Sequence, residues 1–251
     1  MSLSLVSATD NAAGLCVLTP SPRCGDASNA MENNLINIEH LNPPATNPPY
    51  LIKERFRTFL PVIVDVETGG FNPYTDALLE VCMITVQINN QGLMEPKDRY
   101  SVNLRPFEGS TLVRINVDFI GVDPFDPKRN AKDEGQAMRP LFKEIAREVK
   151  EQACTKAILV GHNGSFDLGF INAVANRLKY KRNPFHPFSV IDTASLGALV
   201  YGQTVLSRAC HSAGMTFDEE HAHSAQYDTQ QECELFCRMY NSFTKFAGLP
   251  S

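Results

Sequence analysis

The feature that most constrains the fold of this chain is a short apolar run with two carboxylates at its end. Residues 60–66 are apolar except for Asp65, and Glu67 follows directly. A short and nearly continuous apolar run is typical of a strand that is buried on both faces. Because residues i and i+2 of a strand share a face, Asp65 and Glu67 are expected to point into one cleft. Open α/β sheets commonly bind ligands at this carboxyl end of a strand.

The segments that follow predict a mixed sheet. Residues 78–88 are rich in β-branched side chains, residues 89–92 give a turn signal, and residues 100–104 read as the hairpin partner. Strands are then expected at 157–160 and 189–191, and helices at 134–152, 166–179, 204–213 and 225–246. A hairpin followed by strands that alternate with helices predicts an α/β fold, in which a sheet of antiparallel and parallel strands is flanked by helices.

The first 52 residues differ in composition from the rest of the chain. They are rich in Asn, Pro and Ser, lack periodicity, and contain Pro-Pro pairs at 43–44 and 48–49 that favour extended backbone. We expect a poorly ordered leader over residues 1–52 and a single domain over residues 53–251. Within the leader, Ser-Asn-Ala before Met31 is typical of the remnant of a cleaved expression tag. Mass spectrometry of a natively expressed protein that begins at Met1 would contradict this hypothesis.

Composition favours a cytoplasmic protein. No apolar run approaches the roughly 18 residues that a membrane span needs, and the N-terminus lacks the basic start of a signal peptide. The seven cysteines are odd in number and scattered through apolar segments, which indicates reduced thiols. Cys233 and Cys237 could form half of a zinc site, but no second Cys/His pair of suitable spacing completes it.

Two further acids and a histidine stand at the ends of predicted elements. Asp167 falls at the start of a predicted helix, and Asp228 lies five residues after His223. Taken singly, each acid is more often a first-turn residue that complements a helix dipole, and His223 is more often a surface histidine. If all four acids converge, cations must offset their repulsion. Oxygen ligands favour Mg²⁺ or Mn²⁺ over Zn²⁺, so the combination predicts metal-assisted phosphoryl transfer.

These residues carry a resemblance to the DEDDh family of 3′→5′ exonucleases, which have a ribonuclease H-like fold. The three family motifs are similar to Asp65-x-Glu67, to residues 163–167 and to residues 223–228. Residues 56–71, 184–188, 202–207 and 217–229 resemble more narrowly a bacterial branch of the family that trims tRNA and other stable RNAs. The resemblance covers about residues 55–250. It implies a 3′→5′ exoribonuclease that removes short single-stranded 3′ ends by two-metal phosphodiester hydrolysis.

The resemblance also implies the role of each catalytic residue. Two Mg²⁺ ions, for which Mn²⁺ can substitute, would bind at each active site. Asp65, Glu67 and Asp228 would hold the tighter ion, and Asp65 with Asp167 the more exposed one. His223 would deprotonate the attacking water, while the ions activate that water and stabilise the departing 3′ oxygen.

The resemblance also implies which residues contact RNA. The implied base-stacking residues are Phe71, Phe119, Phe166 and Phe188, although core packing is the commoner role of phenylalanine. The implied RNA-binding residues are Arg55, Arg57, Lys150, Lys156, Lys181 and Arg182. In the family this basic patch faces the active site of the partner in a homodimer, which would let a chain of net charge −5 grip RNA. Ile115 stands where the family has a glutamate, so the preference for a terminal base is left open.

Two other functions are compatible with these residues. A proofreading or repair 3′→5′ exodeoxyribonuclease of the same family would carry the same acids, because only contacts to the 2′-hydroxyl distinguish RNA from DNA. A non-catalytic RNA-binding module would use the aromatic and basic residues alone. The intact acids disfavour that module, since negative charge beside phosphate weakens binding.

Overall fold

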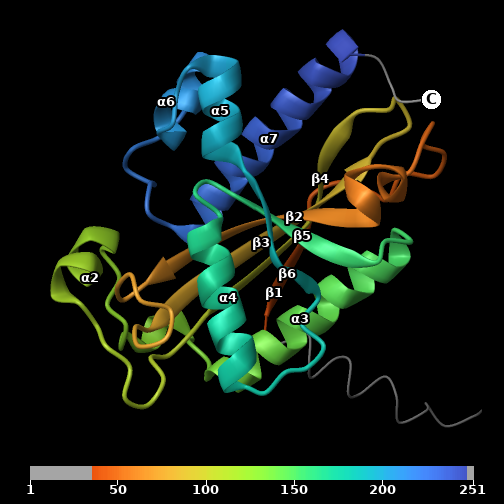
Figure 1. Ribbon diagram of the computed structural model, residues 1–251. Coiled ribbons are helices and arrows are strands. Elements are labelled where there is room, and N and C mark those ends of the chain that lie inside the picture. Colours follow the sequence, from red (N-terminus) through yellow and green to blue (C-terminus); the bar gives the residue numbers. More distant parts are fainter. Residues whose placement is uncertain (1–35, 248–251) are drawn as a thin grey trace, which may run out of the picture.

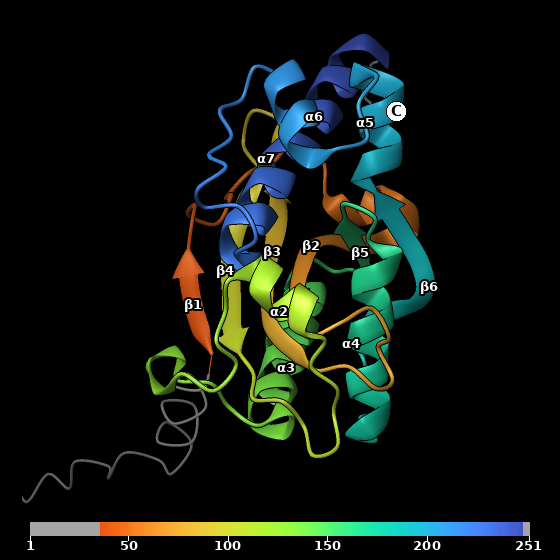
Figure 2. The same cartoon turned by 90° about the vertical axis from the view of Figure 1, so that its left-hand side faces the viewer.

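The computed structural model describes residues 36–247, in which six strands form one sheet (Figure 1). The strands are β1 (Asn37–His40), β2 (Phe59–Thr68), β3 (Leu78–Ile88), β4 (Met94–Asn103), β5 (Lys156–Gly161) and β6 (Phe185–Asp192). Their order is β1-β4-β3-β2-β5-β6. The neighbours β1 and β4, β4 and β3, and β3 and β2 are antiparallel, whereas β2 and β5, and β5 and β6, are parallel. Figure 2 shows β1 and β6 at opposite edges of the sheet. The predicted mixed sheet is confirmed.

Helices cover both faces of this sheet. They are α2 (Arg114–Ile120), α3 (Glu134–Glu151), α4 (Ser165–Arg177), α5 (Thr193–Tyr201), α6 (Leu206–Ser212) and α7 (Ala225–Ala247), with 3₁₀ turns at Ile52–Glu54, Phe56–Thr58 and Pro127–Arg129. Successive residues of a strand point to opposite faces. In β4, Arg99 donates a hydrogen bond to Gln230 of α7, whereas Tyr100 donates one to Glu148 of α3. The two long helices therefore lie on opposite faces, with α4 beside α3 and with α5 and α6 against α7 (Figure 1).

Most predicted elements are present, and the exceptions have physical reasons. The bounds of β3, β5, α3, α4, α6 and α7 agree with prediction to within two residues. β4 begins at Met94 instead of residue 100 because charged residues hide its strand pattern. Lys97 and Asp98 lie in this hidden part, and both are buried and form an ion pair with each other. α2 was not predicted because it has only seven residues, and apolar residues at 115, 117 and 119 alternate instead of following a helical period.

The expectation of a poorly ordered leader is wrong for residues 36–52. β1 pairs with β4, and Ile36 and Ile52 are buried in the core. Residues 43–49 form no strand. The buried side chain of Gln87 forms hydrogen bonds with their backbone instead. The Gln87 amide donates to the carbonyl of Pro43 at 2.8 Å and accepts from the N–H of Ala45 at 3.1 Å. The Ser-Asn-Ala segment before Met31 lies outside the described residues.

Most cysteines of the described residues line the core. The cysteines of the described part of the chain are free, and all but the half-buried Cys154 are buried. Cys233 and Cys237 face the core from α7, and no cluster of metal-binding side chains among residues 36–247 includes them. No helix within that range is long and apolar enough to cross a membrane.

Candidate active site

The carboxyl end of β2 supplies the first two acids. Asp65 lies opposite Cys82 of β3, and Glu67 lies opposite Glu80, so both acids share one face of the strand as predicted. The register shifts between Glu67 and Thr68, which ends the regular ladder directly after the acids. Glu67 is buried, whereas Asp65 is half-buried.

Asp167 reaches the same place from the first turn of α4. The parallel neighbour β5 pairs with β2 only as far as Ile63, so β2 continues beyond it without a partner on that side. The side chain of Asp167 fills this gap, because its Oδ1 accepts a hydrogen bond from the backbone N–H of Val66 at 3.1 Å. Close packing of the connecting loop permits this approach. A Cβ on Gly161 would lie 2.9 Å from the Cα of Gly164.

Asp228 and His223 come from the start of α7 and the loop before it. Oδ2 of Asp228 accepts a hydrogen bond from the backbone N–H of His223 at 3.0 Å. His223 is exposed, has a left-handed backbone (φ 66°), and packs its ring against that of Phe119 with centroids 4.2 Å apart. The backbone of His223 is thus held next to an acid of the cluster, while its ring remains accessible.

The acids converge without a basic partner. Asp65, Glu67 and Asp228 each offer a carboxylate oxygen within 4.8 Å of the others. Oδ2 of Asp65 and Oδ1 of Asp228 are buried and have no hydrogen-bond partner. No ion pair of the described part of the chain includes any of these three acids. Oxygen ligands with unpartnered atoms at this spacing fit a hard divalent cation.

The pKa values reflect the missing positive charge. Burial, and after it the charge of Asp228, raises the pKa of Glu67 to about 8. Burial raises the pKa of Asp167 to about 7, although the N–H of Val66 opposes this shift. The pKa of Asp65 is raised well above its ordinary value by burial and by the surrounding carboxylates. A bound cation would reverse these shifts, because it stabilises the ionised form of each acid.

One acid of this region was missed by the sequence reasoning. Glu232 lies one helical turn after Asp228 on α7 and is only 2% exposed. Its Oε1 accepts from the backbone N–H of His162, and its Oε2 is buried without a partner. The spacing of four residues from Asp228 was the available signal, because residues i and i+4 share a helix face.

The phenylalanines divide into three that lie next to predicted catalytic residues or contact one that does, and one that stands apart. Phe71 is 75% and Phe119 is 66% exposed, which excludes core packing for both. Phe71 meets the half-buried Phe166, the neighbour of Asp167, edge-on at 6.3 Å. Phe188 is 80% exposed but packs against His186, and no ring contact within residues 36–247 joins it to the other three.

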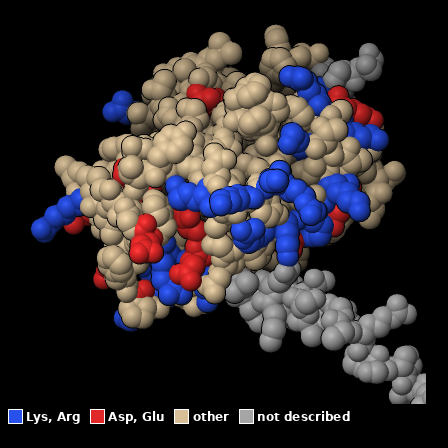
Figure 3. Space-filling model, turned by 60° about the horizontal axis from the view of Figure 1, so that its bottom comes forward, with Lys and Arg blue, Asp and Glu red and all other residues tan. Residues whose placement is uncertain are grey.

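The predicted basic residues gather at the other end of the parallel strands. Arg55 and Arg57 precede β2, Lys156 begins β5, Lys181 and Arg182 precede β6, and Lys150 lies at the end of α3. All are exposed except the half-buried Arg55. Figure 3 shows Lys and Arg side chains gathered in a band across one face of the molecule. Phe59 and Asp65 are separated by six residues of extended strand, roughly 20 Å, so the basic end lies far from the acids of the same chain.

Ile115 lies on α2 and is 75% exposed. It stands one helical turn before Phe119, whose ring contacts His223. An apolar side chain therefore occupies the position for which the resemblance implied a glutamate.

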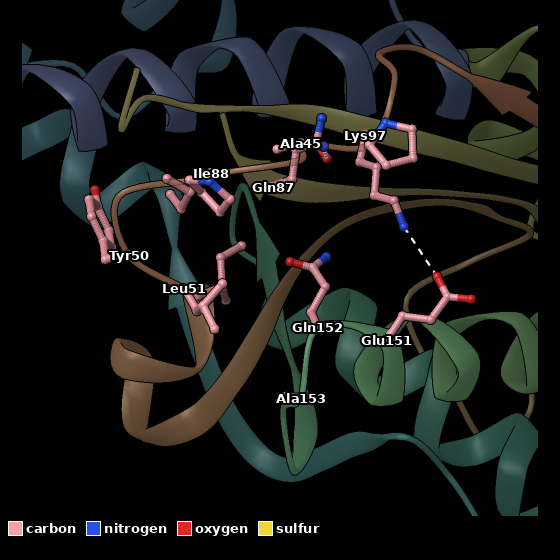
Figure 4. Close-up of a pocket in the computed structure, with 12 residues that line it drawn as sticks. Ala45, Tyr50, Leu51, Gln87, Ile88, Lys97, Glu151, Gln152 and Ala153 are labelled. Carbon is pink, nitrogen blue, oxygen red and sulfur yellow. Dashed lines mark hydrogen bonds and ion pairs between the residues drawn. The ribbon is translucent and has the colours of Figure 1, made fainter. Parts of the chain in front are cut away.

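A cavity of about 260 Å³ lies elsewhere in the fold (Figure 4). The stretch around Tyr50 and Leu51 lines one end, and the ion pair between Lys97 and Glu151 lies at the other. None of the predicted site residues lines it. Its position between residues 44–52 and the end of α3 reflects how that stretch packs against the sheet.

Comparisons with known proteins agree with this geometry. Residues 62–236 match the family described as exonuclease (RNase_T). Ribonuclease T of Hahella chejuensis is 50% identical over 201 residues, which span 80% of this chain and 92% of the relative. Ribonuclease T of Vibrio parahaemolyticus is 48% identical over 205 residues, which span 81% of this chain and 96% of the relative.

Solved structures show the same fold at lower identity. The nuclease domain of 3′hExo, a DEDDh family member bound to rAMP, matches with a TM-score of 0.57 and 17% identity. The match covers 78% of this chain and 94% of that domain. The sheet is therefore the ribonuclease H-like sheet of DEDDh exonucleases.

Proposed function

The chain belongs to the ribonuclease T family of exonucleases, and from this premise we propose that it trims short single-stranded 3′ ends of tRNA and other stable RNAs. It is a 3′→5′ exoribonuclease, as its similarity to ribonuclease T over most of the chain indicates. The observation that carries the proposal is the convergence of Asp65, Glu67 and Asp228, whose oxygens lie within 4.8 Å of one another without a basic partner. We place this RNA processing in the cytoplasm.

The family and the acidic group imply the use of a divalent metal. We assign the site to two Mg²⁺ ions, with Mn²⁺ as a substitute, because every available ligand is a carboxylate oxygen. Asp65, Glu67 and Asp228 would hold the tighter ion, and Asp65 with Asp167 the second. When bound, such ions supply an activated water and stabilise the leaving 3′ oxygen.

His223 would accept the proton of the attacking water. Its side chain is exposed, and its backbone N–H is fixed on Asp228, so the imidazole stands at the rim of the acidic group. Histidine suits this role because its ordinary pKa lies near neutral pH.

The aromatic residues around the acids would hold the 3′ end. Phe71 and Phe119 present exposed rings: Phe119 contacts His223, and Phe71 contacts Phe166, the neighbour of Asp167. Base stacking on such rings contributes roughly 1 to 3 kcal/mol per base and tolerates different sequences. Phe188 would contact RNA further from the reacting phosphate, because its ring lies against His186 instead of the other three rings.

The basic residues would act on the RNA that is bound by a second copy of the chain. They stand at the amino ends of β2, β5 and β6, whereas the acids stand at the carboxyl ends. The predicted basic residues of one protomer therefore lie away from its own acids. In a homodimer each basic patch would face the partner's acids, and RNA with a single-stranded 3′ end would bridge the two.

Digestion of matched hairpins tests the proposed function. An RNA and a DNA of the same sequence, each with a short 3′ overhang and a 5′ label, are incubated with the protein in Mg²⁺ and in EDTA. We expect stepwise shortening of the RNA from its 3′ end in Mg²⁺, arrest near the duplex, and no cleavage in EDTA. Preferred cleavage of DNA would indicate the exodeoxyribonuclease, and binding without cleavage would indicate a non-catalytic RNA-binding module.

A further inference from the structure

Glu232 is a buried acid without a neutralising partner. It lies on α7 with only 2% of its surface exposed. None of the ion pairs among residues 36–247 includes it. Its single hydrogen-bond donor is the backbone N–H of His162, 3.0 Å from Oε1. Oε2 is buried and has no partner, so this oxygen lacks the compensation that a buried carboxylate requires.

The position of Glu232 places it beside the predicted metal ligands. Asp228 lies four residues earlier on the same helix face. The bond to His162 brings Glu232 to the loop between β5 and α4, from which Asp167 emerges. The His162 ring is itself fixed, because Nε2 meets the carbonyl of Thr204 at 2.7 Å.

Electrostatic interactions identify the neighbours of Glu232 more closely. Among the carboxylates around Asp65, Glu232 has the strongest effect in raising the pKa of Asp65 after burial. Asp167 has the strongest such effect on the pKa of Glu232. Glu232 therefore lies near Asp65 and Asp167, the two acids that we assign to the second ion.

We propose that Glu232 is a fifth carboxylate of the cation site and supplies its unpartnered Oε2 to a divalent, oxygen-preferring cation held by Asp65 and Asp167. This inference rests on the proposed metal site but extends its ligand set. The same side chain anchors the loop that precedes Asp167, because its Oε1 holds the N–H of His162. Glu232 thus connects α7 to that loop and adds negative charge where the second ion would bind.

Titration of Mn²⁺ into the metal-free protein tests the inference without relying on catalysis. Calorimetry measures the affinity of each site, and electron paramagnetic resonance of free Mn²⁺ counts the bound ions. We expect Glu232→Gln to weaken the weaker site roughly tenfold, the effect usual for a lost partner at a metal site. Glu232→Asp keeps the charge and should retain part of the affinity. Circular dichroism checks that each variant is folded.

Glu234→Gln is the matched control. Glu234 carries the same charge on the same helix, but it pairs with Arg238 on the half-exposed side. This variant should bind Mn²⁺ as the wild type does. An affinity of Glu232→Gln within twofold of wild type at both sites would overturn the inference and leave the proposed function standing. A wild-type protein that binds no Mn²⁺ would instead contradict the proposed metal site itself.

Discussion

Two buried glutamates on opposite faces of the sheet show how differently this fold treats a buried carboxylate. Glu148 of α3 is fully buried, and Lys97 Nζ lies 2.5 Å from its Oε2. Arg147 and the Tyr100 hydroxyl, each 3.2 Å away, contact its other oxygen. Glu232 of α7 is almost as buried but receives one backbone N–H and no basic side chain.

The difference separates a structural acid from a functional one. A buried carboxylate is costly unless a positive charge or several donors compensate it. Around Glu148 the protein supplies this compensation from its own side chains. Around Glu232, Asp65 and Asp228 it leaves oxygen atoms without partners, which prepares the place for an external cation. The following predictions test this contrast.

The largest effect is expected from Asp65→Asn. It should lower hydrolysis of RNA by more than about a hundredfold, because even outer partners of metal ligands contribute roughly 10- to 100-fold. RNA binding should stay largely intact, as measured by fluorescence anisotropy in EDTA. Activity within tenfold of wild type would remove Asp65 from the metal site.

Glu148→Gln should act on stability instead of activity. Its removal leaves Lys97 buried without its closest partner, which should destabilise the protein by about 3 kcal/mol in urea unfolding. Turnover well below the melting temperature should be unchanged. By contrast, Glu232→Gln should raise the melting temperature of the metal-free protein, since it removes uncompensated charge. If Glu148→Gln and Glu232→Gln lowered the melting temperature of the metal-free protein equally, the contrast between the two acids would fail.

The basic end should be less sensitive, because its residues are exposed and act together. The double variant Lys181→Ala with Arg182→Ala should weaken RNA binding and reduce the slope of log affinity against log salt by about two. Turnover of a dinucleotide, which is too short to reach the basic end, should not change. An unchanged salt slope would refute the assignment of these two residues to the RNA-binding patch.

The smallest effect is a pH dependence of stability in EDTA. The raised pKa values of Glu67, about 8, and Asp167, about 7, mean that the folded state retains protons that the unfolded state has released. Stability without metal should therefore be greatest below the ordinary pKa values of these acids and fall as pH rises through 7 and 8. Saturating Mn²⁺ should reverse this trend. Melting temperatures that are independent of pH in EDTA would contradict the raised pKa values.

Local patterns in the sequence account for much of the fold and the site. The apolar run that ends in Asp65-Val66-Glu67 predicts β2 and two acids on one face, and both are present. The spacing of four residues from Asp228 is the only local signal for Glu232, because its contact with the backbone of His162 depends on a residue that is distant in sequence. β1 depends on partners in β4, and the backbone around Pro43 depends on Gln87, and both sets of partners are distant in sequence. Such long-range compensation leaves no periodic signal.

The most direct test of the contrast is the melting temperature of wild type and Asp65→Asn at pH 8, each in EDTA and in Mn²⁺. If the acidic group is built for a cation, Asp65→Asn will melt higher than wild type in EDTA, and Mn²⁺ will stabilise wild type far more than the variant. A wild-type protein that gains no stability from Mn²⁺, or gains only as much as Asp65→Asn, would contradict the account.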